Sequence, residues 1–348
     1  GMYTKMREGS AWHDVAATVK SLTETAIDSR RAVLVSDDVH PETLLSTGHL
    51  NHVVRRAISE GLNPIKAIQA VTINCAECFG MDQELGAIAP GRYADILFLK
   101  DLAKVEIEKV MVDGQIIAEK GGLLVDLPAV SYPEFVRSSV HLQEPINKAH
   151  FRITAPAGKN SVQIRVMEII EASVLTKHLI AELPVVNGAL EASVEQDLAK
   201  VAVIERHGNN KGIGLGFVKG FGFEGGAVAS TVAHDSHNLL IVGMNDEDMA
   251  LAGNTLAECG GGMVAVRDGK VLALLPLPIA GLMSDRPVEE VAAQLSKVHQ
   301  TWRELGCNLV SPFMTMALLS LPVLPELRLT NRGIVDTVQF RFVDLISS

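Results

Sequence analysis

The first part of the chain alternates short apolar runs with segments of helical spacing. Residues 31–35 form an apolar run rich in β-branched side chains, which predicts a buried strand. Apolar positions spaced by three and four predict helices over about 12–28 and 50–59. A further helix is expected to begin at Pro64, because proline is favoured at the first helical position. This alternation of strand and helix is typical of α/β folds.

The pattern changes at about residue 85, where short apolar runs are separated by tight turns. Asp113-Gly114 lies between two apolar runs and predicts a hairpin. We therefore expect a small β module, followed by a proline-containing linker over 126–150. The expected strands of the module lie at 86–88, 90–92, 95–99 and 110–117.

From residue 151 onward strands and helices are mixed, which favours an α+β domain. A helix over 246–259 is predicted to begin after Asn245 as N-cap, and a second helix over 287–305 carries a regular apolar stripe. The glycines of 212–226 do not fit a dinucleotide fingerprint, so we expect tight turns and close backbone approach there. Strands are predicted at 161–169, 201–206, 227–232, 238–243, 263–267 and 271–275.

The composition is that of folded domains rather than of a disordered chain. Of the 348 residues 47% are hydrophobic and 21% are charged, so sizeable cores can form. The net charge is −10 and the basic residues form no block, which argues against nucleic acid and membrane as partners. Four cysteines do not make a disulfide framework in a chain of this length. The sequence shows no signal peptide and no apolar run of transmembrane length, so we expect a cytoplasmic protein.

Two adjacent carboxylates, Asp37 and Asp38, follow directly after the predicted buried strand at 31–35. In an α/β barrel the catalytic groups lie where strands end. Both carboxylates could therefore bind a metal ion and hold a substrate. The alternative is a structural role, because adjacent aspartates often cap a helix or close a turn.

A second group of polar residues lies at the junction between two predicted strands, at 234–238. His234, Asp235 and His237 are residue types that bind divalent metals or polar substrates. The alternative is a hydrogen-bonded turn with no ligand. His207 lies in a polar loop after Glu205 and could line a site or remain on the surface.

Several segments together resemble a known family. Arg7-Glu8-Gly9-Ser10-Ala11, Ser36-Asp37-Asp38 and the stretch 86–96 are similar to the last barrel units of the amidohydrolase superfamily and the strand entry that follows them. The second half is similar to the domain particular to bacterial adenine deaminases, through 205–208, 214–222, 233–238, 277–284 and 321–330.

The resemblance covers essentially the whole chain and implies its domain organisation. Residues 1–84 would be a remnant of a (β/α)8 barrel, comprising its last two units. Residues 85–130 would be a small β-sandwich segment, and residues 131–348 an α+β C-terminal domain. The implied fold class is thus α/β and α+β, and the chain corresponds to the C-terminal half of the family's chain.

The resemblance also implies an activity, the hydrolytic deamination of adenine to hypoxanthine and ammonia. In such enzymes a divalent metal, Mn²⁺ or Fe²⁺ and possibly Zn²⁺, activates a water molecule. By motif, Asp37 would bind the metal and take part in catalysis, and Asp38 would contact the substrate. The other substrate contacts implied are His207, His234, Asp235 and His237.

The sequence departs from the family in one respect. The superfamily's first strand carries a His-x-His pair and later strands supply further ligands, but nothing in residues 1–36 matches them. We therefore expect the chain alone to be catalytically incomplete, and to self-associate as a homo-oligomer or to require a missing N-terminal half. One alternative is a non-catalytic binding or assembly module derived from an amidohydrolase. Another is a working hydrolase with a metal site relocated to His207, His234, Asp235 and His237.

Overall fold

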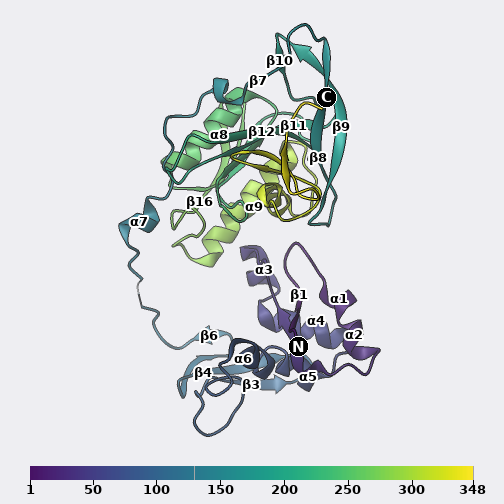
Figure 1. Ribbon diagram of the computed structural model, residues 1–348. Helices are drawn as coiled ribbons and strands as arrows, with labels where there is room; N and C mark the ends of the chain where they lie inside the picture. The colour runs from purple at the N-terminus through teal and green to yellow at the C-terminus, as the bar shows by residue number, and fades with distance from the viewer. Residues whose placement is uncertain (129, 348) are drawn as a thin grey trace. The chain divides into compact units, whose positions relative to one another are not determined.

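The computed structural model of the chain describes residues 1–128 and 130–347 and shows a mixed α/β protein (Figure 1). It divides into two compact units, Gly1–Val130 and Ser131–Ser348. The predicted linker at 126–150 includes residue 129, which lies outside the described residues. Within the described part of the chain, no helix is long and apolar enough to cross a membrane.

The N-terminal unit begins with two strands that pair in parallel, β1 (Thr4–Arg7) and β2 (Ala32–Val35), with Arg7 opposite Val35. Their buried side chains pack against the apolar faces of the helices that follow, as the alternating pattern predicted. The helices of this unit are α1 (Val15–Thr18), α2 (Lys20–Thr23), η1 (Ser29–Arg31), α3 (Pro41–Ser46), α4 (Leu50–Ser59), α5 (Pro64–Gln69) and α6 (Ile73–Phe79). Of these, α1, α2, α4 and α5 contribute side chains to that core.

The prediction of one helix over 12–28 was wrong, because this range contains only the two short helices α1 and α2, and residues 24–28 are not helical. The hydroxyl groups of Thr18, Ser21 and Thr23 donate hydrogen bonds to backbone carbonyls three or four residues earlier. Such bonds compete with the helical backbone ladder and weaken it. The apolar spacing correctly indicated helical structure, and the side-chain hydroxyls explain why the helices are shorter than predicted.

A four-stranded antiparallel sheet completes this unit, in the order β3 (Ile96–Asp101), β4 (Glu106–Val112), β5 (Gln115–Glu119) and β6 (Gly122–Leu123). The predicted hairpin at Asp113-Gly114 is confirmed, and both residues have the positive φ that a tight hairpin turn requires. The strands expected at 86–88 and 90–92 were wrong. A Cβ on Gly86 would lie 2.8 Å from the Ile73 Cα, so this loop packs against α6 instead of joining the sheet.

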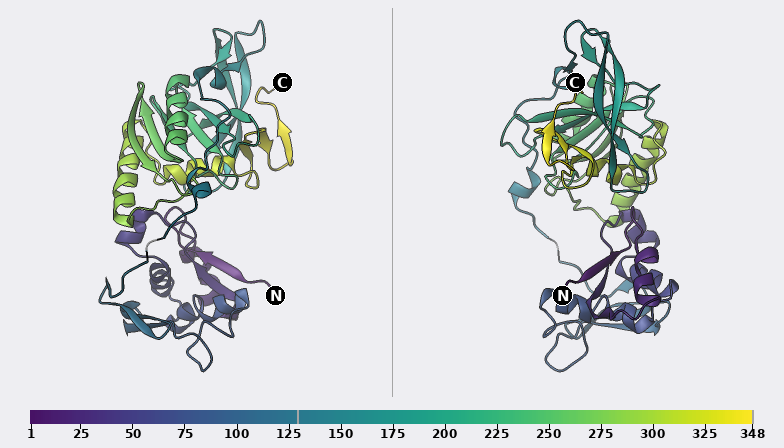
Figure 2. Two further views of the ribbon diagram at one scale, coloured as in Figure 1. Left: turned by 90° about the vertical axis from the view of Figure 1, so that its left-hand side faces the viewer. Right: turned by 45° about the vertical axis from the view of Figure 1, so that its right-hand side comes forward.

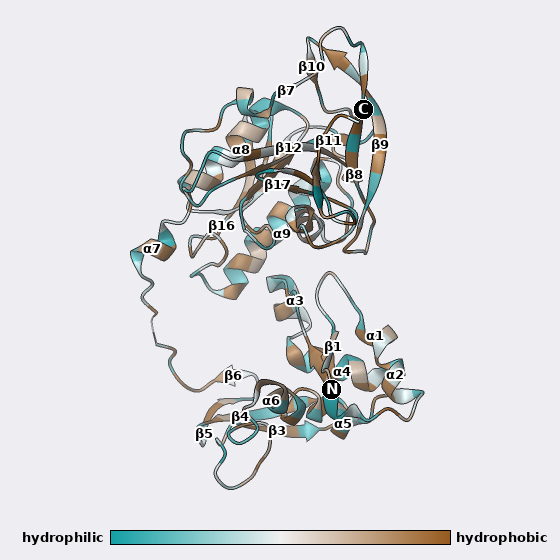
Figure 3. Cartoon of the chain, in the orientation of Figure 1, coloured by the Kyte–Doolittle hydropathy of each residue, from teal (hydrophilic) through white to brown (hydrophobic). Residues whose placement is uncertain are grey.

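The C-terminal unit is built on a ten-stranded sheet in the order β16-β15-β13-β14-β11-β12-β8-β9-β10-β7 (Figure 2). Its pairs are antiparallel except for β12 with β8. The central strands are apolar (Figure 3) and fully buried. The strands are β7 (Ile153–Thr154), β8 (Ser161–Ile169), β9 (Thr176–Val186), β10 (Ala189–Leu190), β11 (Leu198–Ile204), β12 (Ile213–Lys219), β13 (Ala227–Ser230), β14 (Leu239–Gly243), β15 (Gly262–Arg267) and β16 (Lys270–Pro276).

Two long helices cover opposite faces of this sheet, α8 (Asp246–Glu258) and α9 (Val288–Glu304). Alternate residues of the central strands pack in two separate clusters, one with Leu256 of α8 and the other with Trp302 of α9. Both helices agree with their predicted ranges. The remaining elements are α7 (Glu134–Arg137), η2 (Lys148–Phe151), α10 (Pro312–Ala317), η3 (Leu318–Ser320) and the small sheet β17 (Leu327–Thr330), β18 (Gly333–Asp336) and β19 (Arg341–Val343).

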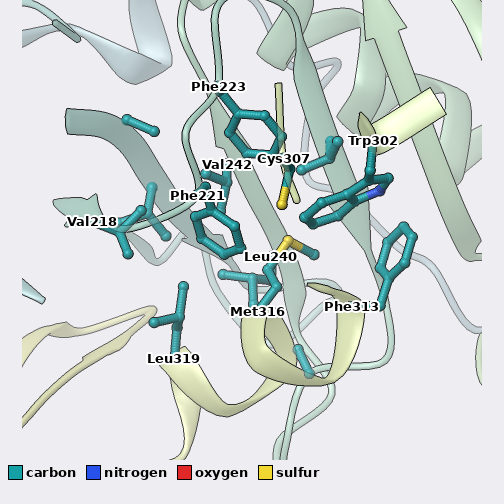
Figure 4. Packing of buried hydrophobic residues seen from close by; sticks show 14 of the residues in the cluster. Val218, Phe221, Phe223, Leu240, Val242, Trp302, Cys307, Phe313, Met316 and Leu319 are labelled. Carbon is teal, nitrogen blue, oxygen red and sulfur yellow. The ribbon is translucent and has the colours of Figure 1, made fainter. Parts of the chain in front are cut away.

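Four aromatic side chains of this unit gather in the cluster on the α9 side of the sheet (Figure 4). The rings of Trp302 and Phe313 lie edge to face with centroids 4.5 Å apart, and Phe221 and Phe223 stack beside them. Such arrangements stabilise a core beyond the area they bury.

The prediction of tight turns in the glycine-rich segment was wrong for Ile213–Lys219, which forms strand β12, whereas Gly220, Gly222 and Gly226 lie outside strands and have the positive φ typical of turns. The expected close backbone approach is confirmed. A Cβ on Gly214 would lie 1.8 Å from the Thr330 carbonyl oxygen, so β17 can cross this strand closely where glycine stands.

Candidate functional site

The carboxyl ends of β1 and β2 lie side by side and bring together the residues that follow each strand. The Glu8 amide donates to the Val35 carbonyl at 3.0 Å, and the Ser10 amide donates to the Asp38 carbonyl at 2.8 Å. The pairing therefore continues beyond the strands themselves. It places Asp37 and Asp38 next to the Arg7–Ser10 segment, as expected for groups at the ends of parallel strands.

Asp37 is half-exposed and is held by an arginine. The Arg7 Nη1 donates to Asp37 Oδ2 at 2.9 Å, and the Arg7 Nε donates to Asp14 Oδ2 at 2.6 Å. Burial would lower the pKa of Arg7, but its bonds to Asp37 and Asp14 outweigh that effect and raise it. Asp37 also has a φ of +58°, a conformation that aspartate tolerates better than most residues.

The neighbouring carboxylate, Asp38, faces the protein instead of solvent. Its Oδ2 accepts a hydrogen bond from the Ala11 amide at 2.7 Å, whereas its Oδ1 is buried with no hydrogen-bond partner in the described structure. A Cβ on Gly9 would lie 2.0 Å from that Oδ1, so only glycine leaves room for it. Burial raises the pKa of Asp38, and the charge of Asp37 raises it further. The two adjacent carboxylates therefore lie in different surroundings, one half-exposed in an ion pair and the other turned toward the protein.

Further polar side chains surround this strand end, and sequence reasoning gave them no role. Glu8 is 5% exposed, and its carboxylate contacts His13 Nδ1 at 3.1 Å and the Val15 amide at 3.3 Å. Arg7 and Asp14 were missed as well. The available signal was that Arg7 and Glu8 end the strand that pairs with β2, which becomes informative once that pairing is known.

The residues present do not fit a metal centre by themselves. Among residues 1–128 and 130–347, no three His, Cys, Asp or Glu side chains are grouped so that they could hold a metal ion. Asp37 has a guanidinium as its partner. One or two carboxylates are too few ligands for a stable divalent site.

The second candidate group lies in the C-terminal unit, where β11 and β14 pair with Ile204 opposite Leu239. This register brings Glu205, Arg206 and His207 next to residues 233–238, which we name the histidine loop. His207 Nε2 hydrogen-bonds to the Ser236 carbonyl at 2.8 Å. Sequence-distant polar residues are thus brought together here as well.

The buried side chain of Arg206 binds the histidine loop through its backbone. Its side chain is 1% exposed and donates to the carbonyl oxygens of His237, Ser139 and Ala280. Burial lowers the pKa of Arg206 to about 10. A buried guanidinium whose bonds go to carbonyl oxygens links three segments that are far apart in sequence.

Within the loop, the histidines are held by backbone contacts, and among the described residues they belong to no group of three side chains that could hold a metal ion. The His234 and His237 rings lie edge to face with centroids 5.5 Å apart, and Asp235 is 81% exposed. His237 Nδ1 accepts from the Ala233 amide at 3.3 Å, and burial lowers the pKa of His237 together with the charges of His234 and Arg206. His237 is therefore neutral at pH 7. This geometry gives no support to a metal site relocated to these side chains and His207.

Glu205 stabilises the loop that carries His207. Its buried carboxylate accepts hydrogen bonds from the amides of His207, Asn209 and Asn210 at 2.8, 3.0 and 3.3 Å. Burial alone would raise the pKa of Glu205, but these bonds outweigh it and the pKa is lowered.

Comparison with known proteins gives matches over the whole chain. Residues 173–341 match the adenine deaminase C-terminal domain, and residues 15–117 match the amidohydrolase family. Proteins named adenine deaminase are 79% identical in Moorella thermoacetica, 55% in Clostridium botulinum (strain ATCC 19397 / Type A) and 45% in Roseobacter denitrificans. These alignments cover 99–100% of this chain and 57–58% of the relatives. The chain therefore spans somewhat over half the length of these relatives.

A solved amidohydrolase structure from Thermotoga maritima MSB8 aligns with 33% of this chain and 37% of that chain, at 18% identity. The TM-score is 0.21, which is too low to support an argument about the fold.

Proposed function

Because this chain belongs with the adenine deaminases of the amidohydrolase superfamily, we propose that it forms part of an enzyme that hydrolyses adenine to hypoxanthine and ammonia. The observation that supports this most directly is the strand end, where Asp37 and Asp38 follow a parallel strand and lie in different surroundings, Asp37 half-exposed and Asp38 facing the protein. Different surroundings let two neighbouring carboxylates take different roles in a catalytic centre.

For the site residues, we propose that Asp37 is the metal-binding and catalytic carboxylate and that Asp38 contacts the substrate. Amidohydrolases generally use a divalent metal, for which we propose Mn²⁺ or Fe²⁺, with Zn²⁺ as a third possibility. The residues of this chain do not hold such an ion alone, so the remaining ligands must come from elsewhere. The Oδ1 of Asp38 is buried without a hydrogen-bond partner, so it can accept a hydrogen bond from a further donor. This supports the assignment of Asp38 as a substrate contact.

We propose that His207, His234, Asp235 and His237 contact adenine. The neutral state of His237 supports this, since a neutral imidazole can exchange hydrogen bonds with a neutral purine. The alternative is a purely structural turn that is held by the backbone contacts of the histidine loop, and substitution at these positions separates the two roles.

For the fold, we propose that residues 1–84 are the last two units of a (β/α)8 barrel, residues 85–130 a β-sandwich segment, and residues 131–348 the adenine deaminase C-terminal domain. The parallel pairing of β1 with β2 across intervening helices supports the barrel assignment. Two strands cannot close a barrel, and each of them has one unpaired edge within the described residues.

The N-terminal unit also has an apolar groove of about 770 Å³, between α4, α6 and the β3–β4 sheet. An open apolar groove next to an edge strand is a place where another polypeptide segment packs. We propose that it is covered by the portion of the longer relatives that has no counterpart in this chain. The groove is lined by side chains such as Val54, Ile68, Val71, Leu97 and Leu99.

The test is an exchange of segments. In the Moorella thermoacetica relative, the region that aligns with this chain is replaced by this chain, and ammonia release from adenine is measured with Mn²⁺. We expect release by the chimera, and none by this chain alone. Asp37→Asn in the chimera is expected to abolish release, whereas Asp28→Asn, an exposed aspartate in the same unit, is expected to leave it unchanged.

A folded chimera that binds Mn²⁺ and releases no ammonia would overturn the proposed activity and favour a non-catalytic binding or assembly module. Release that survives Asp37→Asn would overturn the role of that residue. His207→Gln or His237→Gln in the chimera is expected to raise KM with little change in kcat if these side chains contact adenine.

A further inference from the structure

The histidine loop is fixed to its surroundings near both of its ends. At its start, the His234 amide donates to the Ala317 carbonyl at 3.1 Å, and the Ser320 hydroxyl donates to the His234 carbonyl at 3.0 Å. Near its end, the His237 carbonyl accepts a hydrogen bond from the buried side chain of Arg206. A loop held in this way keeps its side chains in place, which is what recognition of a small ligand requires.

The backbone contacts also determine where each neutral imidazole carries its proton. His237 Nδ1 accepts a hydrogen bond from the Ala233 amide at 3.3 Å, so the proton of the neutral ring is on Nε2. His207 Nε2 lies 2.8 Å from the Ser236 carbonyl oxygen, which can only accept, so the proton of this ring is on Nε2 as well. The two rings therefore have the same tautomer, but the backbone uses Nδ1 of His237 and Nε2 of His207.

The ring nitrogen that remains free differs between the two histidines. Nε2 of His237 is a donor and Nδ1 of His207 is an acceptor, and neither atom has a hydrogen-bond partner within residues 1–128 and 130–347. The two residues lie close together, because His207 bonds to the carbonyl of Ser236, which directly precedes His237. One donor and one acceptor are thus available on neighbouring side chains.

The donor of His237 is suited to an uncharged ligand. Burial lowers the pKa of His237, and the charges of His234 and Arg206 lower it further, so its ring is neutral at pH 7. Asp235 is the one carboxylate in the loop sequence, and it is 81% exposed and contacts the His234 ring at 3.7 Å. A neutral imidazole N–H matches a neutral acceptor such as a ring nitrogen of a heterocycle.

We propose that Nε2–H of His237 and Nδ1 of His207 together recognise an amidine, in which a ring nitrogen accepts and the adjoining amino group donates. This rests on the proposed function, in which both side chains contact adenine. Adenine has two such edges, formed by its 6-amino group with N1 and with N7. His237 donates to the ring nitrogen, and His207 accepts from the amino group. The pair therefore recognises the group that the proposed reaction removes.

The tautomers are measured by ¹H–¹⁵N correlation spectra of the imidazole rings in this chain at pH 8, above the ordinary histidine pKa of about 6.5. Both His207 and His237 are expected to carry the proton on Nε2. The variants His207→Phe and His237→Phe each remove one set of ring signals and so assign them. A proton on Nδ1 of either ring in the wild-type chain would contradict the proposal.

Ligand binding is then measured by titrating adenine into the same labelled chain. Adenine at millimolar concentration is expected to shift the ring signals of both histidines. Purine lacks the 6-amino group and hypoxanthine has an oxygen there that only accepts, so each is expected to bind about two- to tenfold more weakly, the effect of one hydrogen bond. Of 1-deazaadenine and 7-deazaadenine, one is expected to bind more weakly by a similar factor, and that one identifies the ring nitrogen that His237 contacts.

The variants make the outcome specific. His207→Phe is expected to bind adenine and purine equally, because the acceptor for the amino group is gone. His178→Phe is the matched control, since His178 lies on β9 in the same unit and its Nε2 has no hydrogen-bond partner among the described residues. It is expected to keep the preference for adenine. Amide spectra of each variant establish that it is folded.

Two results of the titration would overturn the proposal. The first is that adenine shifts neither ring, and the second is that the folded wild-type chain binds adenine and purine equally. Neither measurement uses activity, so failure here is distinct from failure of the chimera to release ammonia, which tests the proposed function itself.

Discussion

Replacing Arg206 with methionine tests how the histidine loop is held in place. Arg206 is 1% exposed and links that loop to segments that lie near Ser139 and Ala280. Methionine has a similar length and is apolar, so it fills much of the same space and removes the hydrogen bonds. The outcome depends on whether those bonds outweigh the cost of burying the charge.

The structure allows both quantities to be estimated. Arg206 donates four hydrogen bonds, and bonds that involve a charged group contribute roughly 1.5–3 kcal/mol each. Burial lowers the pKa of Arg206 to about 10, which corresponds to a desolvation cost of about 3 kcal/mol. Four bonds at the lower end of their range exceed this cost, so we expect Arg206→Met to lower the free energy of unfolding by about 3 kcal/mol.

Urea unfolding followed by fluorescence measures this change. In a Trp12→Phe background Trp302 is the remaining tryptophan, and it reports on the C-terminal unit alone. Arg328→Met is the matched control, because Arg328 is equally buried and, like Arg206, donates four hydrogen bonds, which in Arg328 all go to carbonyl oxygens. We expect it to lose similar stability and to leave the pKa of His237 unchanged.

Burial is the largest cause of the lowered pKa of His237, and the charge of Arg206 lowers it further. Arg206→Met removes that charge and is therefore expected to raise the pKa of His237. NMR titration of the imidazole measures it. A loss of unfolding free energy below about 1 kcal/mol would refute the reasoning, since it would mean that desolvation of the guanidinium cancels its hydrogen bonds.

Three further predictions concern single positions. Asp38→Asn is expected to stabilise the N-terminal unit by about 1 kcal/mol at pH 7 and not at pH 3. The raised pKa of Asp38 means that this group contributes stability when the pH is below 3.8, the ordinary aspartate pKa, and that the contribution is lost as the pH rises. Equal thermal stability of both chains at pH 7 would contradict this. Glu205→Gln is expected to lower the free energy of unfolding in urea by about 1–2 kcal/mol at pH 7 and by little at pH 3. The lowered pKa of Glu205 means that this group contributes stability when the pH is above 4.5, the ordinary glutamate pKa, and that the contribution is lost as the pH falls. A loss independent of pH would show that charge is not the cause. Gly9→Ala is expected to cost about 1–3 kcal/mol, because the new Cβ would meet Asp38 Oδ1, and Asp38→Ala in the same chain should restore most of that loss in the same assay.

Local physical rules acting on the sequence determined the main elements of this protein. The apolar run that became β2, the hairpin at Asp113-Gly114 and the two long helices α8 and α9 follow from side-chain periodicity, positive φ and capping, which depend on nearby residues. The position of Asp37 and Asp38 after a buried strand could be predicted in the same way. The similarity of several separate segments to adenine deaminases was also present in the sequence.

Contacts between distant residues were decided only by the tertiary structure. Turns were predicted where strand β12 lies, because glycines have low strand propensity. The close crossing of β17 explains why glycine stands at position 214, and this contact between distant segments leaves no local pattern in the sequence. The Arg7–Asp37 ion pair needs β1 and β2 to be neighbours, which is a question of strand pairing. Partners far apart in sequence decide whether a buried polar group is satisfied or left alone, because hydrogen bonds depend on distance in space and not along the chain.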